Sequence, residues 1–335
     1  MVNFAIENAL ESHRIYIHPS ISFLNLDIPK NVLETPGMVS IAERKMLYLL
    51  AIQNYSGRGA VIDAGSFMGS SVVSLAQGLR DNPNLKQLMS SFDRQSKPIN
   101  SYELGYLPKP TNGSEFVRKF GDVEYRFGDS FLGILKESIE SFEDMIELNI
   151  GDFCDFDWPD TPIELCFVDL CKTAKLNRHV SAHFLPNLIE GDAFFVNQDF
   201  FFDRLPWIKV TMGYLHEYFE WYGQVFTSSI YKSKKKIPKD VAEFDPFTEA
   251  SLDECLRLHD LHPSVHLEDM DKFRMSLSRS YLMAIKGKTV SALEYLESIE
   301  EEFEHILDDE ATNDRGNKFR LKRAFRQIQR RVVIR

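Results

Sequence analysis

Cysteine is scarce in this sequence of 335 residues. The four that occur, Cys154, Cys166, Cys171 and Cys255, form no Cys-x-x-Cys pair. We therefore expect reduced thiols that pack inside the protein, as is usual in the cytoplasm. Long apolar runs are also missing. The first residues lack a basic start followed by an apolar stretch, and no run approaches the length of about 18 apolar residues typical of a membrane span. These absences favour a cytoplasmic protein without a membrane partner.

A surplus of basic charge is absent as well. The net charge is −11, which argues against a general nucleic-acid partner, since such proteins present a basic surface. With 44% hydrophobic and 12% aromatic residues, the chain can bury a large globular core.

Basic charge is concentrated in one place, the segment from Arg315 to Arg335, which holds nine basic residues and no acid. The preceding stretch, Val290 to Asp314, holds ten acidic residues and no Lys or Arg. One interpretation is a contact with RNA or a membrane surface. We favour an antiparallel helical hairpin, in which the two segments pack together through one apolar stripe. Its expected members are Phe319, Phe325, Ile328 and Val332.

Two common nucleotide motifs are missing from the glycine-containing stretch VIDAGSFMGSS, residues 61–71. Phe67 stands where a dinucleotide fingerprint requires its second glycine, and no Gly-Lys-Ser/Thr follows as in a P-loop. What is present is Asp63 followed by two spaced glycines. An acid suits a cation rather than a phosphate, which favours S-adenosylmethionine, a cofactor with a sulfonium, an ammonium and a carboxylate. The contact residues expected here are Asp63, Gly65, Ser66, Gly69 and Ser70.

Apolar runs alternate with helical patterns between residues 59 and 237. Such alternation predicts a doubly wound, Rossmann-like α/β fold, here with a mainly parallel seven-stranded sheet from about Ala60 to Ser233. We expect an N-terminal helical segment over residues 1–58, the cofactor-binding domain over 59–237, and a C-terminal helical extension over 238–335. The parallel strands are expected within residues 60–65, 86–94, 145–153, 163–170 and 191–200, with an antiparallel pair within 222–235.

Acidic residues follow the expected strands in order. Asp93 ends the second strand, where a carboxylate grips ribose hydroxyls in related folds. Asp152 and Phe153 follow the third strand, and they offer an acceptor and an aromatic face for an adenine. Each acid alone could be a helix cap or a solvated turn. Three acids at three successive strand ends indicate a binding site for S-adenosylmethionine.

With these residues, the stretch from Met38 to Ser233 resembles the class I S-adenosylmethionine-dependent methyltransferases. Within them it is similar to the cation-dependent O-methyltransferases, including the macrocin and sugar O-methyltransferase group. The resemblance implies a metal site, possible for Mg²⁺, at Asp169 together with Gln198 and Asp199. Gln198 departs from the family, which often has a carboxylate at that position.

The resemblance implies methylation of a hydroxyl on a small-molecule or glycan acceptor. Asp169 would act at the acceptor, and the general base stays open among Lys172, His179, His183 and His216. Two other functions also stay open. One is metal-independent N-methylation, and the other is a non-catalytic protein that keeps the donor fold as a binding or scaffolding module. A homo-oligomer is compatible with the sequence.

Overall fold

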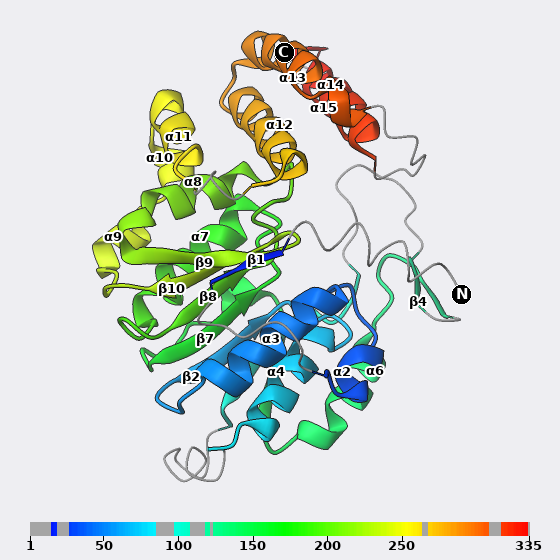
Figure 1. The fold of residues 1–335 in the computed structure, drawn as a ribbon, viewed down its shortest axis with the longest axis vertical. Coiled ribbons are helices and arrows are strands. Elements are labelled where there is room, and N and C mark those ends of the chain that lie inside the picture. The colour runs from blue at the N-terminus through cyan, green and yellow to red at the C-terminus, as the bar shows by residue number, and fades with distance from the viewer. Residues whose placement is uncertain are drawn as a thin grey trace.

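The computed structural model describes residues 15–18, 27–84, 97–107, 118–120, 123–262, 267–307 and 316–333. Its centre is an eight-stranded sheet in the order β1-β9-β10-β8-β7-β2-β3-β6 (Figure 1). The strands are β1 (Ile15–Ile17), β2 (Ala60–Ala64), β3 (Ile99–Glu103), β6 (Ile146–Ile150), β7 (Ile163–Val168), β8 (Phe194–Asn197), β9 (Phe219–Val225) and β10 (Ser228–Ser233). A separate hairpin joins β4 (Arg118–Phe120) to β5 (Val123–Tyr125).

Five strands of the sheet, β6, β3, β2, β7 and β8, pair in parallel, and β10, β9 and β1 extend the sheet in antiparallel pairs. Neighbouring side chains of the parallel strands enter two different cores, which shows that both faces are covered. Val61 and Phe167 belong to one apolar cluster, and Ile62 and Val168 belong to the other. A strand buried on both faces reads as a continuous apolar run, which explains the sequence pattern.

Helices on the two faces of the sheet supply the rest of these two apolar cores (Figure 1). On one face lie α3 (Ile41–Asn54), α4 (Ser70–Asp81) and α6 (Leu132–Ile139), with the short α2 (Lys30–Glu34) beside them. On the other lie α7 (Ala174–His183) and α8 (Pro206–Tyr214). Short 3₁₀ turns occur at Glu140–Phe142, Phe153–Asp155, Leu185–Asn187 and His216–Tyr218. The predicted Rossmann-like α/β fold is confirmed.

Two details of the sheet correct the sequence expectations. The N-terminal segment is not only helical, because β1 adds an eighth strand beside β9. The second parallel strand is β3, not residues 86–94, which lie outside the described residues. Strand β2 has only two edges, and β3 and β7 occupy them. Residues 99–103 belong to the stretch 95–113, whose three prolines and two glycines are typical of a loop.

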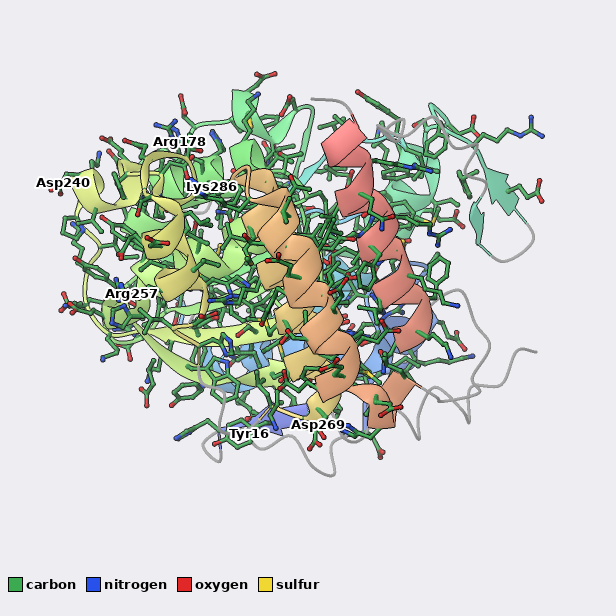
Figure 2. All side chains as sticks on the ribbon, turned by 90° about the horizontal axis from the view of Figure 1, so that it is seen from above. Tyr16, Arg178, Asp240, Arg257, Asp269 and Lys286 are labelled. Carbon is green, nitrogen blue, oxygen red and sulfur yellow. The ribbon has the colours of Figure 1, made fainter. Side chains whose placement is uncertain are left out.

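The C-terminal extension is helical throughout its described residues. It comprises α9 (Lys239–Glu243), α10 (Pro246–Glu249), α11 (Leu252–His259), α12 (Asp269–Ile285), α13 (Thr289–Glu302), α14 (Glu304–Leu307) and α15 (Asn317–Val333). Helices α12, α13 and α15 lie side by side (Figure 2) and bury their own apolar cluster. None of the described helices is both long enough and apolar enough to cross a membrane.

The acidic α13 and the basic α15 therefore pack together, as the hairpin interpretation predicts. The predicted apolar stripe of α15 is only partly right. Its fully buried positions are Leu321, Ala324 and Ile328, with Phe325 partly buried beside them. Two arginines of α15, Arg320 and Arg323, pair with a carboxylate of the sheet domain instead of with α13.

Candidate active site

The carboxyl edge of the parallel strands is where the candidate site lies. In open α/β sheets, ligands bind at this edge where the strand order reverses, which here is between β2 and β7. Backbone bonds hold the strand ends together: the Asp169 amide donates to Ala64 (2.7 Å), and the Gln198 amide donates to Val168 (3.0 Å). Each parallel strand carries an acid at or just after its end. These acids are Asp63, Glu103, Asp152, Asp169 and Asp199.

The glycine loop turns from β2 into α4 against this edge. Gly65 has φ +103°, and a Cβ there would meet the Asp169 carbonyl at 3.0 Å. Gly69, at φ +110°, is the N-cap of α4. Only glycine adopts such backbone freely and permits this approach, so the spacing of the two glycines is a requirement of the turn. Phe67 also has a positive φ, and its backbone amide donates a hydrogen bond to the Glu103 carboxylate (2.6 Å).

Asp63 is fully buried beneath the loop. Its Oδ2 accepts hydrogen bonds from Ser66 Oγ (2.5 Å) and Ser101 Oγ (3.4 Å). Burial raises the pKa of Asp63 to about 6, although the serine hydroxyls oppose that shift. Asp63 therefore stabilises the glycine loop through these hydrogen bonds, from the buried side of the loop. Ser66 and Ser70 are also buried, so in this structure both support the loop from within.

Glu103 takes the place that the sequence assigned to Asp93. It ends β3, the strand beside β2, whereas Asp93 lies outside the described residues. Its Oε2 accepts from Phe67, and its Oε1 accepts from the amides of Leu104 (2.8 Å) and Gly105 (3.3 Å). Burial raises the pKa of Glu103, and the hydrogen bonds from these backbone amides oppose the shift. A carboxylate has further acceptor capacity, so Glu103 can still take hydroxyl donors.

The residues that follow β6 differ in their exposure to solvent. Asp152 is exposed and accepts from the Cys154 amide (2.9 Å) as the cap of a 3₁₀ turn. Phe153 is buried and stacks on Phe184, with ring centroids 4.9 Å apart. Asp152 is therefore open to a ligand, while Phe153 is mainly a core residue. Phe156, which lies over Gly151 and is only partly buried, is the more accessible aromatic ring at this strand end.

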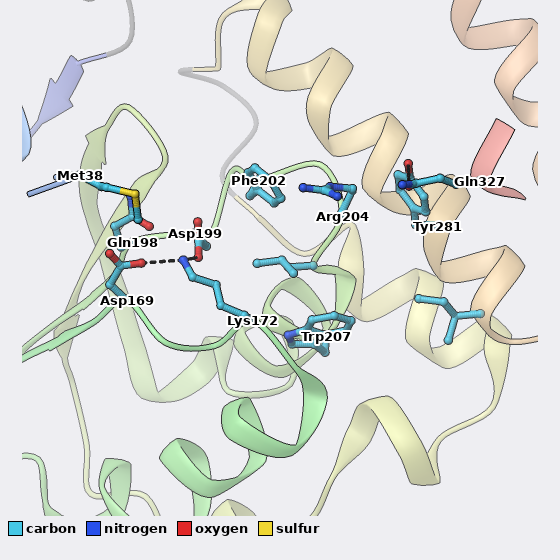
Figure 3. A pocket seen from close by; sticks show the side chains of 12 residues that line it. Met38, Asp169, Lys172, Gln198, Asp199, Phe202, Arg204, Trp207, Tyr281 and Gln327 are labelled. Carbon is cyan, nitrogen blue, oxygen red and sulfur yellow. Dashed lines mark hydrogen bonds and ion pairs between the residues drawn. The ribbon is translucent and has the colours of Figure 1, made fainter. Parts of the chain in front are cut away.

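Asp169, Gln198 and Asp199 converge, as the sequence predicts, and Lys172 joins them (Figure 3). Lys172 Nζ donates to Asp169 Oδ1 (2.7 Å) and to Asp199 Oδ2. With its amide nitrogen turned toward the acids, Gln198 donates to Asp169 Oδ1 (2.9 Å) and Asp199 Oδ1 (3.0 Å), and its oxygen accepts from Thr227 (3.2 Å). This acid–lysine cluster is satisfied by its own members.

The pKa values of Asp169 and Lys172 in the acid–lysine cluster are both raised, for different reasons. Burial raises the pKa of Asp169, Lys172 lowers it, and Asp199 raises it again. Desolvation opposes the charge of Lys172, but the two carboxylates outweigh it and raise the pKa of the ammonium. Lys172 is therefore protonated at neutral pH. Asp169 holds a proton more readily than an ordinary aspartate does.

The acid–lysine cluster does not fit the divalent cation that the family resemblance implied. The Lys172 ammonium stands between the two carboxylates and supplies their counter-charge. A hard cation requires oxygen ligands around it, and here the ammonium takes the position where the two carboxylates would share such an ion. Among the residues that the structure describes, no group of three His, Cys, Asp or Glu side chains is placed to hold a metal.

A pocket of about 630 Å³ opens beside the acid–lysine cluster (Figure 3). The sheet edge forms one wall, the loop after β8 forms another, and helices α12 and α15 contribute the far side. It is lined by Met38, Asp169, Lys172, Gln198, Asp199, Phe202, Arg204, Leu205, Trp207, Tyr281, Ile285 and Gln327. Its size suits a small-molecule ligand. Sequence analysis missed its far wall, because contacts with the C-terminal helices have no local pattern.

The structure does not bring His216 to this site. His216 is exposed, bonds the Gly213 carbonyl through Nδ1 (2.8 Å), and directly precedes β9. The first residue of β9, Phe219, pairs with Ser233, and the adjacent Lys232 pairs with Phe194 at the start of β8. His216 therefore lies at the amino edge of the parallel strands, and its expected catalytic role is wrong. His179 bonds the Phe156 carbonyl (2.9 Å) instead.

Comparisons with known proteins give a limited result. No family model matches the sequence, and no curated protein matches it. Among solved structures, the crystal structure of CalS11, a calicheamicin methyltransferase, is similar with a TM-score of 0.40 and 14% identity. The match covers 63% of this chain and 88% of that chain. A likeness at this level does not establish a shared activity.

Proposed function

We propose that the protein is an S-adenosylmethionine-dependent methyltransferase that acts on a hydroxyl of a small molecule. The observation that carries this proposal is the row of carboxylates at the ends of all five parallel strands. From Ala60 to Ser71 the chain has no Lys or Arg. Such an edge repels a pyrophosphate and favours a cofactor whose reactive end is a cation.

Different residues at this edge fit different groups of the donor. The N-terminus of α4 suits its carboxylate, since the first backbone amides of a helix favour an anion. Glu103 suits the ribose hydroxyls, and Asp152 with Phe156 suits the adenine. When bound, the donor supplies an electrophilic methyl group on a sulfonium. The charge of that sulfonium is compatible with the nearby Asp169.

Asp169 and Lys172 can serve the acceptor. The carboxylate of Asp169, with its raised pKa, would accept the proton of the acceptor hydroxyl, and that oxygen would bond to the methyl carbon as the carbon–sulfur bond breaks and S-adenosylhomocysteine leaves. Lys172 stays protonated and stabilises the negative charge that develops on that oxygen. Asp199 holds Lys172 in place. The expected role of Lys172 as a base is therefore replaced by that of an electrostatic partner.

Donor binding tests the proposal most directly. Calorimetry with S-adenosylhomocysteine should show binding, while NAD should not bind comparably. Glu103→Gln should weaken it by roughly 1–3 kcal/mol, because a charged acceptor of hydroxyl donors is lost. Glu254→Gln serves as the control, since Glu254 lies on α11 and pairs with Arg257. Tight NAD binding, or no binding of S-adenosylhomocysteine, would contradict the assignment.

Methyl transfer without a metal is the second part of the test. Because Lys172 fills the place between the two carboxylates, we expect the initial rate with a hydroxyl acceptor to be unchanged by EDTA. Lys172→Met should abolish transfer and leave S-adenosylhomocysteine binding nearly intact. Loss of activity in EDTA with recovery in Mg²⁺ would overturn the metal-free arrangement.

A further inference from the structure

The candidate pocket contains a cation that the proposed chemistry does not use. Arg204, in the loop between β8 and α8, is half-buried, and its guanidinium lies 4.9 Å from the ring centroid of Phe202. Among the described residues, Arg204 has no ion pair, and its buried Nε has no hydrogen-bond partner. Burial lowers the pKa of Arg204, and Arg323 adds to that shift, but an arginine stays charged in proteins.

The acids nearest in sequence and space are already engaged. Asp203, fully buried, takes Arg320 at 3.3 Å and Arg323 at 2.8 Å. Asp199 is paired with Lys172. Arg204 is thus a partly desolvated positive charge that feels Asp203 and Asp199 at a distance but makes no direct ion pair in the described structure, so a ligand anion can supply that partner.

The surroundings of Arg204 define the shape of that ligand. In Figure 3, Phe202 lies between the acid–lysine cluster and Arg204, and Tyr281 and Gln327 lie beyond Arg204. Trp207, fixed by its bond to the Cys171 carbonyl (2.8 Å), adds an aromatic surface to the pocket. Tyr281 donates to Gln327 (2.7 Å), which leaves the amide nitrogen of Gln327 as a further donor.

We propose that the methyl acceptor is an anion: a flat or apolar body that bears a carboxylate, which pairs with Arg204, and a hydroxyl, which reaches Asp169. The hydroxyl of the acceptor is inferred from the proposed methyltransferase function, whereas its carboxylate is inferred independently of that function. The guanidinium presents a fork of donors that matches a carboxylate. The aromatic walls suit the planar body, and Lys172 removes the repulsion that two free carboxylates would exert.

Two probes that differ in charge alone test the proposal. Binding of 4-hydroxybenzoate and of 4-hydroxybenzamide is measured by calorimetry on the full chain with saturating S-adenosylhomocysteine. The wild type should bind the carboxylate at least about tenfold more tightly than the amide, since a charge-assisted pair is lost with the amide. Arg204→Gln should remove this preference, and Arg204→Lys should keep part of it.

Arg257→Gln is the matched control. Arg257 lies on α11 at the outer surface (Figure 2), where it pairs with Glu254. This variant should keep the full preference for the carboxylate. Equal binding of the two probes by the wild type, no detectable binding of the carboxylate, or an unchanged preference in folded Arg204→Gln would overturn the proposal. The wild-type comparison decides the matter even if Arg204→Gln does not fold.

The same titrations separate this inference from the proposed function. If S-adenosylhomocysteine does not bind, the methyltransferase assignment fails, and the two probes are then compared without it. A retained Arg204-dependent preference would still support an anion site. Donor binding without that preference would uphold the function and overturn only the anionic acceptor.

Discussion

A single buried lysine shapes the wall of the candidate pocket. Lys209 of α8 is only 1% exposed, and its Nζ donates to the carbonyls of Phe202 (2.5 Å) and Leu205 (3.2 Å). These carbonyls belong to the loop that carries Arg204. Lys209 thus holds the backbone on both sides of Arg204, although sequence reasoning had no means to single it out.

Burial lowers the pKa of Lys209 to about 7, although Asp203 and Asp199 oppose the shift. The unfolded chain keeps this proton up to a pH of about 10.5, so between those values it binds more protons than the folded chain does. Stability should therefore rise with pH there, at most by roughly 1.4 kcal/mol per pH unit. Urea unfolding of wild type and Lys209→Met from pH 7 to 10 measures the difference. Equal pH slopes would contradict this expectation.

Gly65 is a second residue whose replacement has a definite cost. Its φ of +103° and its contact with Asp169 both exclude a side chain. Gly65→Ala should destabilise the protein by at least about 1–2 kcal/mol, the cost of a left-handed conformation, with a further loss from displacing Asp169. The measurement is the free energy of unfolding in urea.

Gly133 provides the control for Gly65, because it lies in α6 with open space around its Cα. Gly133→Ala should stabilise the protein by roughly 0.5–1 kcal/mol, as expected within a helix. If both substitutions had the same effect, the special backbone at Gly65 would not matter.

At the scale of elements, one carboxylate links the loop after β8 to α15. Asp203 has no exposed surface, and its partners Arg320 and Arg323 retain side-chain exposures of 13% and 21%. Asp203→Ala should cost about 3 kcal/mol, because it removes the buried carboxylate that two partly buried arginines share. Asp192→Ala, which removes the half-exposed pair with Arg58, should cost at most about 1 kcal/mol. Thermal and urea unfolding of both variants compares them.

The elements differ in how far sequence predicts them. Strands β2, β6, β7 and β8 are largely apolar runs, and their positions were predicted within a few residues. Strand β3 contains Asn100 and Ser101, and its buried serine bonds Asp63 rather than packing in an apolar core. A polar strand inside a sheet, here next to the edge strand β6, gives no apolar pattern in the sequence, so Glu103 was missed with it.

The site residues also differ in how far the sequence predicts them. The family resemblance placed Asp169, Gln198 and Asp199 in one site, and the structure brings them together because the ends of neighbouring parallel strands meet at one edge. His216 was misassigned, since its place depends on which way β9 runs. Arg204 carried no signal, because its importance comes from helices more than 70 positions later in the chain, those that contribute Tyr281 and Gln327.

The whole molecule contains cores of unequal size. The sheet domain buries large apolar clusters on both faces, whereas α12, α13 and α15 share a smaller one. We expect amides of β2 and β7 to exchange only through global unfolding, and those of α13 and α15 to exchange faster through partial opening. Hydrogen exchange followed by mass spectrometry measures this difference. Equal protection of the two regions would show a single cooperative unit.

The far wall of the pocket also has a consequence for the order of events during synthesis. Strand β10 ends at Ser233, so the complete sheet leaves the ribosome well before α15, which supplies Gln327 and the partners of Asp203. Domains generally fold as they emerge. A nascent chain should therefore form the carboxyl edge of its sheet first and acquire the far wall of the candidate pocket only when α15 docks. Translation itself would thus leave the pocket incomplete until α15 has emerged.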